Sequence, residues 1–379
     1  MKLAIPKERQ ADEPRVAATP DTVKKYVGLG MDVCVETGAG DGSYISDQAY
    51  KDAGATIAPS SAEALKDADL VFAVRAPDDE QLGLIKKGAV LAAILNPYGD
   101  RDRVQKYADA GIVAIAMEFM PRITRAQSMD VLSSQSNLAG FRAVIEAAAA
   151  FSRAMPMMMT AAGTVAPARV FVFGAGVAGL QAIATAKRLG AIVSATDVRR
   201  AAGEQIESLG GTFIMVESDD EDGETAAGYA KEMSEDYKQR QAALVAEHIK
   251  KQDIVITTAL IPGRAAPVLV SEEMVKSMKP GSIIVDLAVE QGGNCPLSKP
   301  GETVVTENGV TILGFKNMAG RLPVDASSLY AKNLLNFITP QIDQEAKSLN
   351  LNWEDETVTG TALTRDGAVV HPALKGESA

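Results

Sequence analysis

The sequence predicts an α/β protein with two doubly wound domains, joined by two long helices that leave a cleft between them. Short apolar strands alternate with helical segments along most of the chain, which is the pattern of parallel βαβ units. A G-x-G-x-x-G motif follows one of these strands and opens a helix. Two long helical patterns interrupt the alternation. They divide the chain into a first domain of residues 1–136 plus 322–379 and a second of residues 137–321.

Composition limits the class of protein. The chain has 379 residues, enough for two or three domains, and its 46% hydrophobic and 23% charged residues are typical of a soluble globular protein. A net charge of −11 argues against nucleic-acid binding and against docking on anionic lipid. No apolar stretch is long enough for a membrane-spanning helix, and the N-terminus MKLAIPKERQ lacks the apolar core of a secretory signal.

Cysteine and histidine are scarce. The two cysteines, Cys34 and Cys295, lie far apart and have no metal-ligand spacing, so we predict no metal site and a reduced, cytoplasmic location. Cys34 falls on a predicted strand, where we expect it to pack in the core. The two histidines, His248 and His371, lie outside every motif described below.

The first domain begins with a strand at residues 2–5. Thr19 and Pro20 form the N-cap and first position of a helix that we expect to run to about Leu29. Further strands are predicted at 32–36, 70–74, 90–95 and 113–116, with a helix at 102–110. GAGDGS, at 38–43, contains glycines but no helix pattern follows it, so we interpret it as a turn.

Two helical connectors are predicted. In residues 131–155, apolar side chains recur at i, i+3, i+4 and i+7 until Pro156 stops the pattern, and about 20 helical residues span roughly 30 Å. The second connector covers residues 325–338 and ends or kinks at Pro340. The tail, 349–379, then returns to the first domain. Between the connectors, strands are expected near residues 170, 192, 213, 254, 283 and 311.

The stretch 168–199, ARVFVFGAGVAGLQAIATAKRLGAIVSATDVR, carries the clearest ligand signal. A Val- and Phe-rich strand precedes the glycines. We expect Gly174 to make the tight turn, Gly176 to let the backbone approach a pyrophosphate, and Gly179 to let the helix pack closely on the strand. The free N–H groups of the helix N-terminus then face the phosphates. This context predicts a Rossmann-like dinucleotide site; the alternative is a βαβ unit without a ligand.

Asp197 ends the next strand, 18 residues after Gly179. Its carboxylate is placed to accept hydrogen bonds from a ribose 2′-hydroxyl, and its charge would repel a 2′-phosphate. We therefore expect NAD(H) rather than NADP(H). Arg199 and Arg200 argue the other way, because an arginine can accommodate that phosphate.

A second candidate site precedes the first connector. The stretch 120–136, MPRITRAQSMDVLSSQS, is dense in polar groups. Arg122, Gln127, Asp130 and Ser133 can form one hydrogen-bonded cluster in which Asp130 pairs with Arg122. In the alternative interpretation, Asp130 only caps the helix that follows.

Three other stretches have both a functional and a structural interpretation. ALIPG, at 259–263, follows a predicted strand and would reach the nicotinamide end of a cofactor, or it is a simple turn. The acidic segment 217–241 is a solvated loop and exposed helix, or a mobile lid that carries Tyr229. The methionines at 155–159 are expected to fill the core.

Several of these motifs together resemble a known family. IPKERQADEPRVAATP and the glycine motif are similar to the alanine dehydrogenase and pyridine nucleotide transhydrogenase family. MPRITRAQSMDVLSSQSNLAG, TTALIPG and DLAVEQGGNCP resemble its transhydrogenase branch, specifically the NAD(H)-binding component of the proton-translocating, Si/Re-type enzymes. The resemblance covers essentially the whole chain. The end near HPAL, with no membrane helices, resembles the split form in which this component is a separate polypeptide.

The resemblance implies roles for individual residues. Those around the nicotinamide and the partner's NADP(H) would be Arg122, Gln127, Asp130, Ser133 and the closing aromatic Tyr229. Those that bind NAD(H) would be Gly174, Gly176, Val177, Gly179, Asp197, Val198, Arg199, Ser128, Met129, Gly228, Gln241 and Leu260.

The two branches of the family differ in chemistry. Alanine dehydrogenases move a proton as well as a hydride, and they use a lysine and a histidine of the first domain. The corresponding strand ends here carry Arg75 and Asn96, neither of which titrates near neutral pH, and Arg15 alone could only orient a carboxylate. Transhydrogenation needs no acid or base, only two nicotinamide rings held at about 3–3.5 Å. The sequence therefore favours the transhydrogenase branch; an amino-acid dehydrogenase and an NAD(H)-sensing subunit are the alternatives.

The resemblance also implies partners. We expect NADP(H) on a partner subunit, a membrane-spanning subunit that carries protons, and a homodimer of this chain. The chain would then lie on the cytoplasmic face of the inner membrane, held by its partners and not by insertion into lipid.

Overall fold

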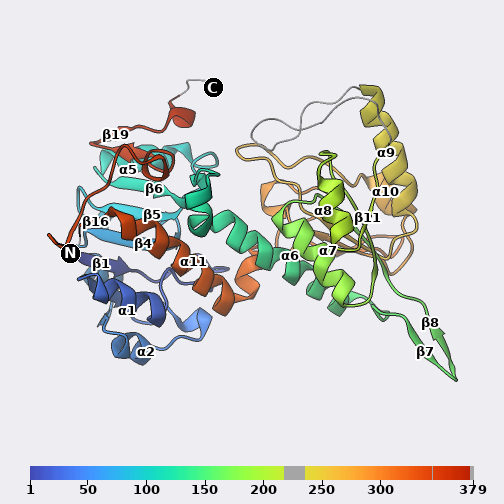
Figure 1. Ribbon diagram of the computed structural model, residues 1–379, viewed down its shortest axis with the longest axis horizontal. Coiled ribbons are helices and arrows are strands. Elements are labelled where there is room, and N and C mark those ends of the chain that lie inside the picture. The colour runs from blue at the N-terminus through green and yellow to red at the C-terminus, as the bar shows by residue number, and fades with distance from the viewer. Residues whose placement is uncertain (217–234, 344, 376–379) are drawn as a thin grey trace. The chain divides into compact units, whose positions relative to one another are not determined.

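The computed structural model describes residues 1–216, 235–343 and 345–375 (Figure 1). The chain folds into two compact units. The first contains Met1–Gln135 and Ala319–Ala379, and the second contains Ser136–Met318. Each is built around a mainly parallel sheet, so the prediction of two doubly wound α/β domains is confirmed.

The first unit has a six-stranded parallel sheet in the order β3-β2-β1-β4-β5-β6. Its strands are β1 Lys2–Ile5, β2 Asp32–Glu36, β3 Thr56–Ala58, β4 Leu70–Arg75, β5 Val90–Ile94 and β6 Val113–Ala116. Its helices are α1 Pro20–Gly28, α2 Asp47–Asp52, α3 Ser61–Leu65, α4 Asp79–Leu84, α5 Arg101–Asp109, α11 Pro323–Ile338 and α12 Glu356–Thr359. The strands and helices predicted for this part of the chain are present, within one or two residues at their ends.

Alternation along the strands explains the two layers of helices. Leu3 and Ile5 of β1 belong to one hydrophobic core, with α1, α2 and α11, whereas Ala4 between them belongs to a second core with α3, α4 and α5. Successive side chains of a strand point to opposite faces, so a strand buried on both faces must be apolar at every position. This is the physical basis of the short continuous apolar runs in the sequence.

The helix α1 begins as predicted. Thr19 is its N-cap and Pro20 its first residue, and Thr19 and Thr22 form a reciprocal capping pair. Tyr26 and Val23 lie on its buried face. GAGDGS is a turn followed by a single 3₁₀ turn at Asp41–Ser43, and α2 begins only after the N-cap Ser46.

The C-terminal segment packs on the first unit. α11 follows a 3₁₀ turn, Met318–Arg321, and Pro340 ends its helical course within another 3₁₀ turn, Thr339–Gln341. Leu363 N donates to Ala114 O at the edge strand β6 (2.8 Å). The predicted return of the tail is therefore confirmed. Two short antiparallel pairs and a 3₁₀ turn complete it: β16 Ile342–Asp343 with β17 Ser348–Leu349, β18 Thr364–Arg365 with β19 Ala368–Val369, and the turn Pro372–Leu374.

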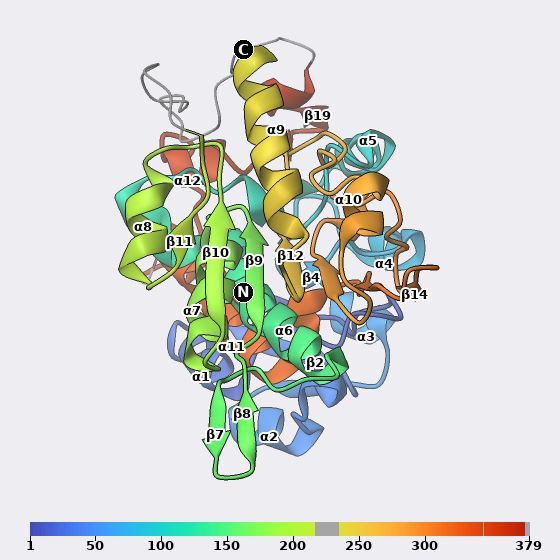
Figure 2. The ribbon, with the colours of Figure 1, turned by 90° about the vertical axis from the view of Figure 1, so that its right-hand side faces the viewer.

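The second unit has a seven-stranded sheet in the order β11-β10-β9-β12-β13-β15-β14, part of which faces the viewer in Figure 2. Its strands are β9 Arg169–Phe173, β10 Ile192–Thr196, β11 Thr212–Phe213, β12 Ile254–Thr257, β13 Ile283–Asp286, β14 Thr303–Val305 and β15 Thr311–Leu313. Its helices are α7 Val177–Arg188, α8 Ala202–Ser208, α9 Glu235–Ile249 and α10 Glu272–Ser277. The six predicted strands are confirmed; the sequence analysis missed β14, which pairs antiparallel with β15.

The first connector is the helix α6, Val131–Ala150, which begins where predicted but ends five residues early. Beyond it, Met155 is buried, whereas Met157, Met158 and Met159 are 59%, 45% and 71% exposed. They lie at the antiparallel hairpin of β7 Met158–Thr160 and β8 Gly163–Val165, which extends from the second unit in both views (Figures 1 and 2). The prediction that these methionines fill the core is wrong, because the hairpin has no layer packed on it to bury them.

Gly140 sets the approach of α6 to α7. A Cβ atom at this position would lie 2.1 Å from Ala178 O, a backbone atom that cannot move aside cheaply. Gly83 in α4 is a matched case without contact, since its Cβ would meet nothing within 4 Å.

We expect Gly140→Ala to lower the free energy of unfolding of the second unit by about 1–3 kcal/mol, because overpacking must push two helices apart. Gly83→Ala should be neutral or stabilise by about 0.5–1 kcal/mol, the helix propensity gain. Urea unfolding of both variants checks this. Similar effects of the two substitutions would contradict the close approach of α6 to α7.

Candidate functional site

The second unit presents apolar side chains at one edge of its sheet. β10, β9 and β12 are adjacent and parallel, so their carboxyl ends lie together. Val177, Val198 and Leu260, which follow these strands, are 42%, 50% and 48% exposed. Exposed apolar side chains gathered at the carboxyl ends of parallel strands are typical of a ligand site. These three residues were all predicted to contact the cofactor.

The three glycines of the motif have distinct geometries. Gly174 has a φ of +96°, the left-handed turn that the sequence predicts. A Cβ on Gly179 would lie 1.8 Å from Gly174 O, which confirms the close packing of α7 on the strand. A Cβ on Gly176 would meet nothing within 4 Å. The backbone at Gly176 therefore borders open space, the side from which a pyrophosphate can approach.

The start of α7 fits an anionic group. Gly176 is its N-cap and has no side chain to bond the first N–H groups of this 12-residue helix. Those groups and the positive end of the helix dipole therefore face the open space beside Gly176. The glycine turn, this helix end and the exposed apolar residues together fit a dinucleotide.

Asp197 locks the glycine turn. Its carboxylate accepts hydrogen bonds from Ala175 N (2.7 Å) and Arg199 N (2.8 Å). The Arg199 guanidinium lies on the same carboxylate, with Nε 3.0 Å from Oδ1. The Asp197 side chain is only 7% exposed. The arginine that argued for a 2′-phosphate is thus paired with the acid that argues against one.

Gln241 of α9 also reaches this edge of the sheet. Its Nε2 donates to Thr196 Oγ1 (2.9 Å) and Ile214 O (3.2 Å), and its Oε1 accepts from Val216 N (2.9 Å). The predicted site residues Gly228 and Tyr229 lie outside the described residues, as does most of the acidic segment 217–241.

The polar stretch of the first unit forms the junction between two helices. It folds as a 3₁₀ helix, Thr124–Met129, followed directly by α6. Asp130 caps α6: its carboxylate accepts from Ser133 N (2.9 Å) and Ser133 Oγ (2.5 Å). The predicted ion pair of Asp130 with Arg122 is not among those of the described residues, because the cap occupies both carboxylate oxygens.

Side chains of α11 fix this junction. Asn333 Nδ2 and Asn336 Nδ2 both donate to Ser128 O, at 2.9 and 3.0 Å, and Ser134 Oγ donates to Asn333 Oδ1. Arg122, Gln127 and Ser128 remain exposed or partly exposed. Met129 is 6% exposed and packs in the core of the first unit. The Met129 side chain therefore serves packing, and its predicted contact with a cofactor would have to be made by its backbone.

The charges at the carboxyl end of the first sheet turn inward. Arg15 is 3% exposed and binds Glu13 through Nε (2.6 Å) and Gln135 Oε1 through Nη1 (2.8 Å). Arg75 Nε donates to the same Glu13 (2.9 Å). Burial raises the pKa of Glu13, but the hydrogen bond and charge of Arg15 outweigh it and hold the pKa below its usual range. Arg15 is thus engaged within the fold and does not present its guanidinium to a substrate carboxylate.

Two carboxyls at this end titrate near neutral pH, which the sequence analysis missed. Burial raises the pKa of Glu8 to about 8 and that of Glu118 to about 7. Glu8 accepts backbone N–H groups from Val74 and Arg75, and Glu118 accepts them from Leu95 and Asn96. Oε2 of Glu118 is buried and has no hydrogen-bond partner among the described residues. No local pattern announces such groups, since their burial depends on the assembled sheet.

Both histidines serve the fold. His248 Nε2 lies 2.8 Å from Ser194 Oγ and its ring packs edge-on against Phe171. His371 Nε2 bonds Gly360 O, and its ring lies against Phe119. Burial lowers the pKa of both imidazoles, so both are neutral at pH 7.

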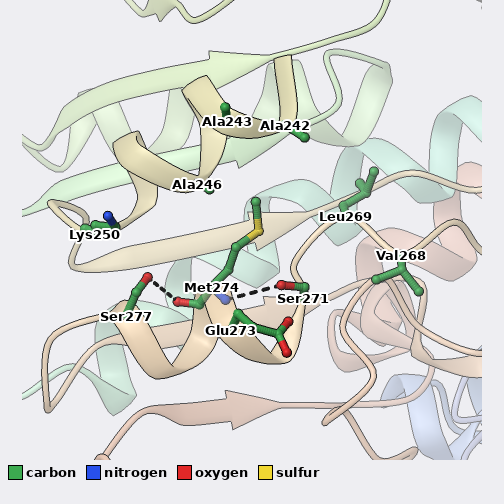
Figure 3. A pocket seen from close by; sticks show the side chains of 10 residues that line it. All are labelled: Ala242, Ala243, Ala246, Lys250, Val268, Leu269, Ser271, Glu273, Met274 and Ser277. Carbon is green, nitrogen blue, oxygen red and sulfur yellow. Dashed lines mark hydrogen bonds between the residues drawn. The ribbon is translucent and has the colours of Figure 1, made fainter. Parts of the chain in front are cut away.

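A hollow of about 550 Å³ lies elsewhere in the second unit, between α9 and α10 (Figure 3). Ala242, Ala243 and Ala246 line one side and Met274 the other. None of the predicted site residues lines this hollow. Among the described residues, no helix is long and apolar enough to cross a bilayer.

Family comparisons cover both units. The model described as Alanine dehydrogenase/PNT, N-terminal domain, matches residues 4–139, and the C-terminal domain model matches residues 143–372. The chain belongs to the alanine dehydrogenase/PNT family. The resemblance predicted from its motifs is confirmed.

Individual relatives separate the two branches. The chain is 60% identical, over 100% of both chains, to the first of the polypeptides that make up the alpha subunit of NAD(P) transhydrogenase in Rhodospirillum rubrum. A crystal structure of transhydrogenase from Sinorhizobium meliloti has a TM-score of 0.89 at 55% identity and covers 98% of this chain and 100% of that one. An L-alanine dehydrogenase structure has a TM-score of 0.80 at 26% identity, with 99% and 98% covered. The fold is shared with both, and the identity places the chain in the transhydrogenase branch.

The raised pKa of Glu8 predicts a pH dependence of stability. Between its ordinary pKa of 4.5 and about 8, the folded chain holds a proton on Glu8 that the unfolded chain releases. The free energy of unfolding should therefore fall as pH rises through this window, by at most about 1.4 kcal/mol per pH unit from this group. Glu8→Gln cannot titrate and should remove that part of the slope. Urea unfolding from pH 5 to pH 8 checks this; parallel profiles for the two proteins would contradict it.

Proposed function

We propose that this chain is the NAD(H)-binding subunit of a proton-translocating NAD(P)⁺ transhydrogenase. In the reaction, NADH and NADP⁺ give NAD⁺ and NADPH by direct hydride transfer. The observation that carries the proposal is the fit of the second unit to a dinucleotide: the left-handed Gly174, the open space beside Gly176, and the exposed Val177, Val198 and Leu260. The similarity to the transhydrogenase subunit of Rhodospirillum rubrum supports it.

The residues at the edge of the second sheet would hold NAD(H) from both ends. The N–H groups at Gly176 and Val177 face the side for the pyrophosphate. Asp197 and Val198 would take the adenosine ribose, with Arg199 held beside them by the Asp197 carboxylate. Leu260, with Gly228 and Gln241, would lie toward the nicotinamide. NAD(H) supplies the hydride, and the chain supplies the position from which it leaves.

Direct transfer explains why the titratable groups are built into the fold. Only a hydride moves between the two nicotinamides, so no oxygen or nitrogen gains or loses a proton. The requirement is alignment, and misplacement by about 1 Å costs on the order of 100-fold in rate. Arg122, Gln127, Asp130 and Ser133 of the first unit would align the nicotinamide and its redox partner, and Tyr229 would close the site.

The proposal includes partners. NADP(H) would be held by a second subunit, and a membrane-spanning subunit would couple the reaction to proton movement. The chain would work as a homodimer on the cytoplasmic face of the inner membrane, attached through those subunits. Its net charge of −11 disfavours attachment to anionic lipid.

The direct test mixes this chain, NADH deuterated at the transferred position, and an NADP⁺-loaded NADP(H)-binding subunit. Deuterium should appear in NADPH without loss to water. Asp130→Asn should slow this transfer by about 10-fold or more and change the Kd for NADH by less than about threefold, because the substituted side chain keeps the oxygen that accepts from Ser133 N but loses the charge. Equal losses in rate and affinity would contradict an aligning role.

The same experiment separates the alternatives. Tight NADH binding without transfer would favour an NAD(H)-sensing subunit. Oxidation of L-alanine by the purified chain with NAD⁺ would favour an alanine-dehydrogenase-type enzyme, for which Glu118, with its unpartnered oxygen among the described residues, is the available acid or base. Glu118→Gln should abolish that oxidation if it occurs and leave transhydrogenation intact.

The pairing of Asp197 with Arg199 predicts cofactor preference. NADH should bind far more tightly than NADPH, since the carboxylate repels a 2′-phosphate and engages the arginine. Asp197→Ala removes the repulsion and releases Arg199 from this pair, so the ratio of NADPH to NADH affinity should rise by about 10-fold or more. Calorimetric titration of both nucleotides checks this. Comparable affinities in the parent chain would overturn the argument.

A further inference from the structure

One sequence motif remains without a function in the account above. In DLAVEQGGNCP, Asp286 ends β13 and its carboxylate accepts from Ala288 N (3.0 Å) and Cys295 N (3.1 Å). Gly292 and Gly293 have φ of +95° and +79°, so the chain makes two left-handed steps in succession. A Cβ on Gly293 would lie 2.8 Å from Asp286 Oδ2. Asp286 and the glycines thus fold the chain back on itself and fix the residue that follows, Asn294.

Asn294 closes the neck of another loop. Its side-chain Nδ2 donates to both Ala259 O (2.9 Å) and Pro267 O (2.8 Å), and its Oδ1 accepts from Ala259 N (3.2 Å). One amide therefore joins the first and last residues of the loop 259–267. Asn294 is itself 0% exposed, and its backbone oxygen accepts from Leu269 N and Val270 N just beyond the loop.

The loop that Asn294 closes presents apolar side chains to solvent. Leu260 and Ile261 are 48% and 41% exposed. They follow β12, whose end adjoins the glycine turn: Thr258 Oγ1 donates to Phe173 O (3.0 Å). A loop with both ends pinned at a single buried point keeps its tip at a fixed height over the sheet edge.

We propose that Asn294 is a positioning residue for hydride transfer: it acts through the loop 259–267 to set where Leu260 stands against the nicotinamide end of bound NAD(H). This inference rests on the proposed function. Asn294 touches neither cofactor nor reacting atoms. Its two donated bonds hold the neck closed, and a neck that opens lets Leu260 move by the distances on which transfer depends.

The chain offers a matched control for the loss of a buried amide. Asn308 also bonds backbone carbonyls through Nδ2, at Val275 O (3.0 Å), Lys276 O (3.3 Å) and Met278 O (3.3 Å). It lies in the same unit and holds the end of α10, away from the loop 259–267. A general loss of stability should therefore affect Asn294→Ala and Asn308→Ala alike, whereas a positioning role should separate them.

The experiment uses the full chain with NADH and the NADP⁺-loaded partner subunit, together with amide exchange of the chain alone. Asn294→Ala should slow single-turnover transfer by about 10- to 100-fold and weaken NADH binding by about fivefold or less. Amide exchange at residues 260–266 should accelerate. Asn308→Ala should leave the transfer rate and this exchange unchanged. Asn294→Asp keeps the acceptor for Ala259 N but loses both donated bonds, so it should behave as Asn294→Ala does.

A second comparison tests the route through Leu260. Leu260→Ala should slow transfer on its own, and combining it with Asn294→Ala should cost less than the product of the two separate effects. Independent effects, rescue by Asn294→Asp, or equal losses in Asn308→Ala would overturn the inference. Unchanged exchange at 260–266 in Asn294→Ala would overturn it whether or not the chain transfers hydride. Absence of transfer in the parent chain, with faster exchange in the variant, would instead overturn the proposed function.

Discussion

Buried acceptors at the carboxyl ends of the strands hold both sheets to their loops. A loop that leaves a parallel strand carries backbone N–H groups without ladder partners, and each one left unpaired in the interior costs about 1–3 kcal/mol. In this chain a nearby carboxylate takes them: Glu36 accepts from Lys7 N, Glu8 from Val74 N and Arg75 N, Glu118 from Leu95 N and Asn96 N, Asp197 from Ala175 N, and Asp286 from Cys295 N. Ligands of doubly wound sheets bind at this same edge, so these bonds also fix the geometry of the site.

The same carboxylates restrict the chemistry available there. Glu13 binds both Arg15 and Arg75, and the pair with Arg15 is almost completely buried. A buried charge keeps its partner because separation would leave it desolvated and uncompensated. In the second unit, Asp197 both locks the glycine turn and holds Arg199, so one side chain couples the shape of the pyrophosphate site to the charge around the ribose.

Local patterns predicted most of the fold and the glycine motif, because strand burial and helix caps leave short-range signals: Thr19 and Pro20 begin α1 where expected. The failures have other causes. Asp130 caps its own helix where an ion pair with Arg122 was predicted, since Ser133 competes from three residues away. The exposed methionines of the β7–β8 hairpin resemble core residues in the sequence because composition does not reveal whether a layer covers them. The clamp of Asn294 on Ala259 spans 35 positions and left no signal.

The contrast within the family follows from what the strand ends bind. A dehydrogenase needs a group that changes protonation during the reaction and stays within reach of its substrate. Here Arg75 donates to Glu13, Asn96 does not titrate, and both oxygens of Glu8 accept backbone N–H groups. Removing a proton from Glu8 would place a charge among buried groups, and moving it would strand the end of β4. Side chains bound in this way are poorly suited to proton transfer but well suited to rigidity. Direct hydride transfer requires the second property and not the first, so the interactions that stabilise the sheet edge are compatible with that reaction and oppose the other.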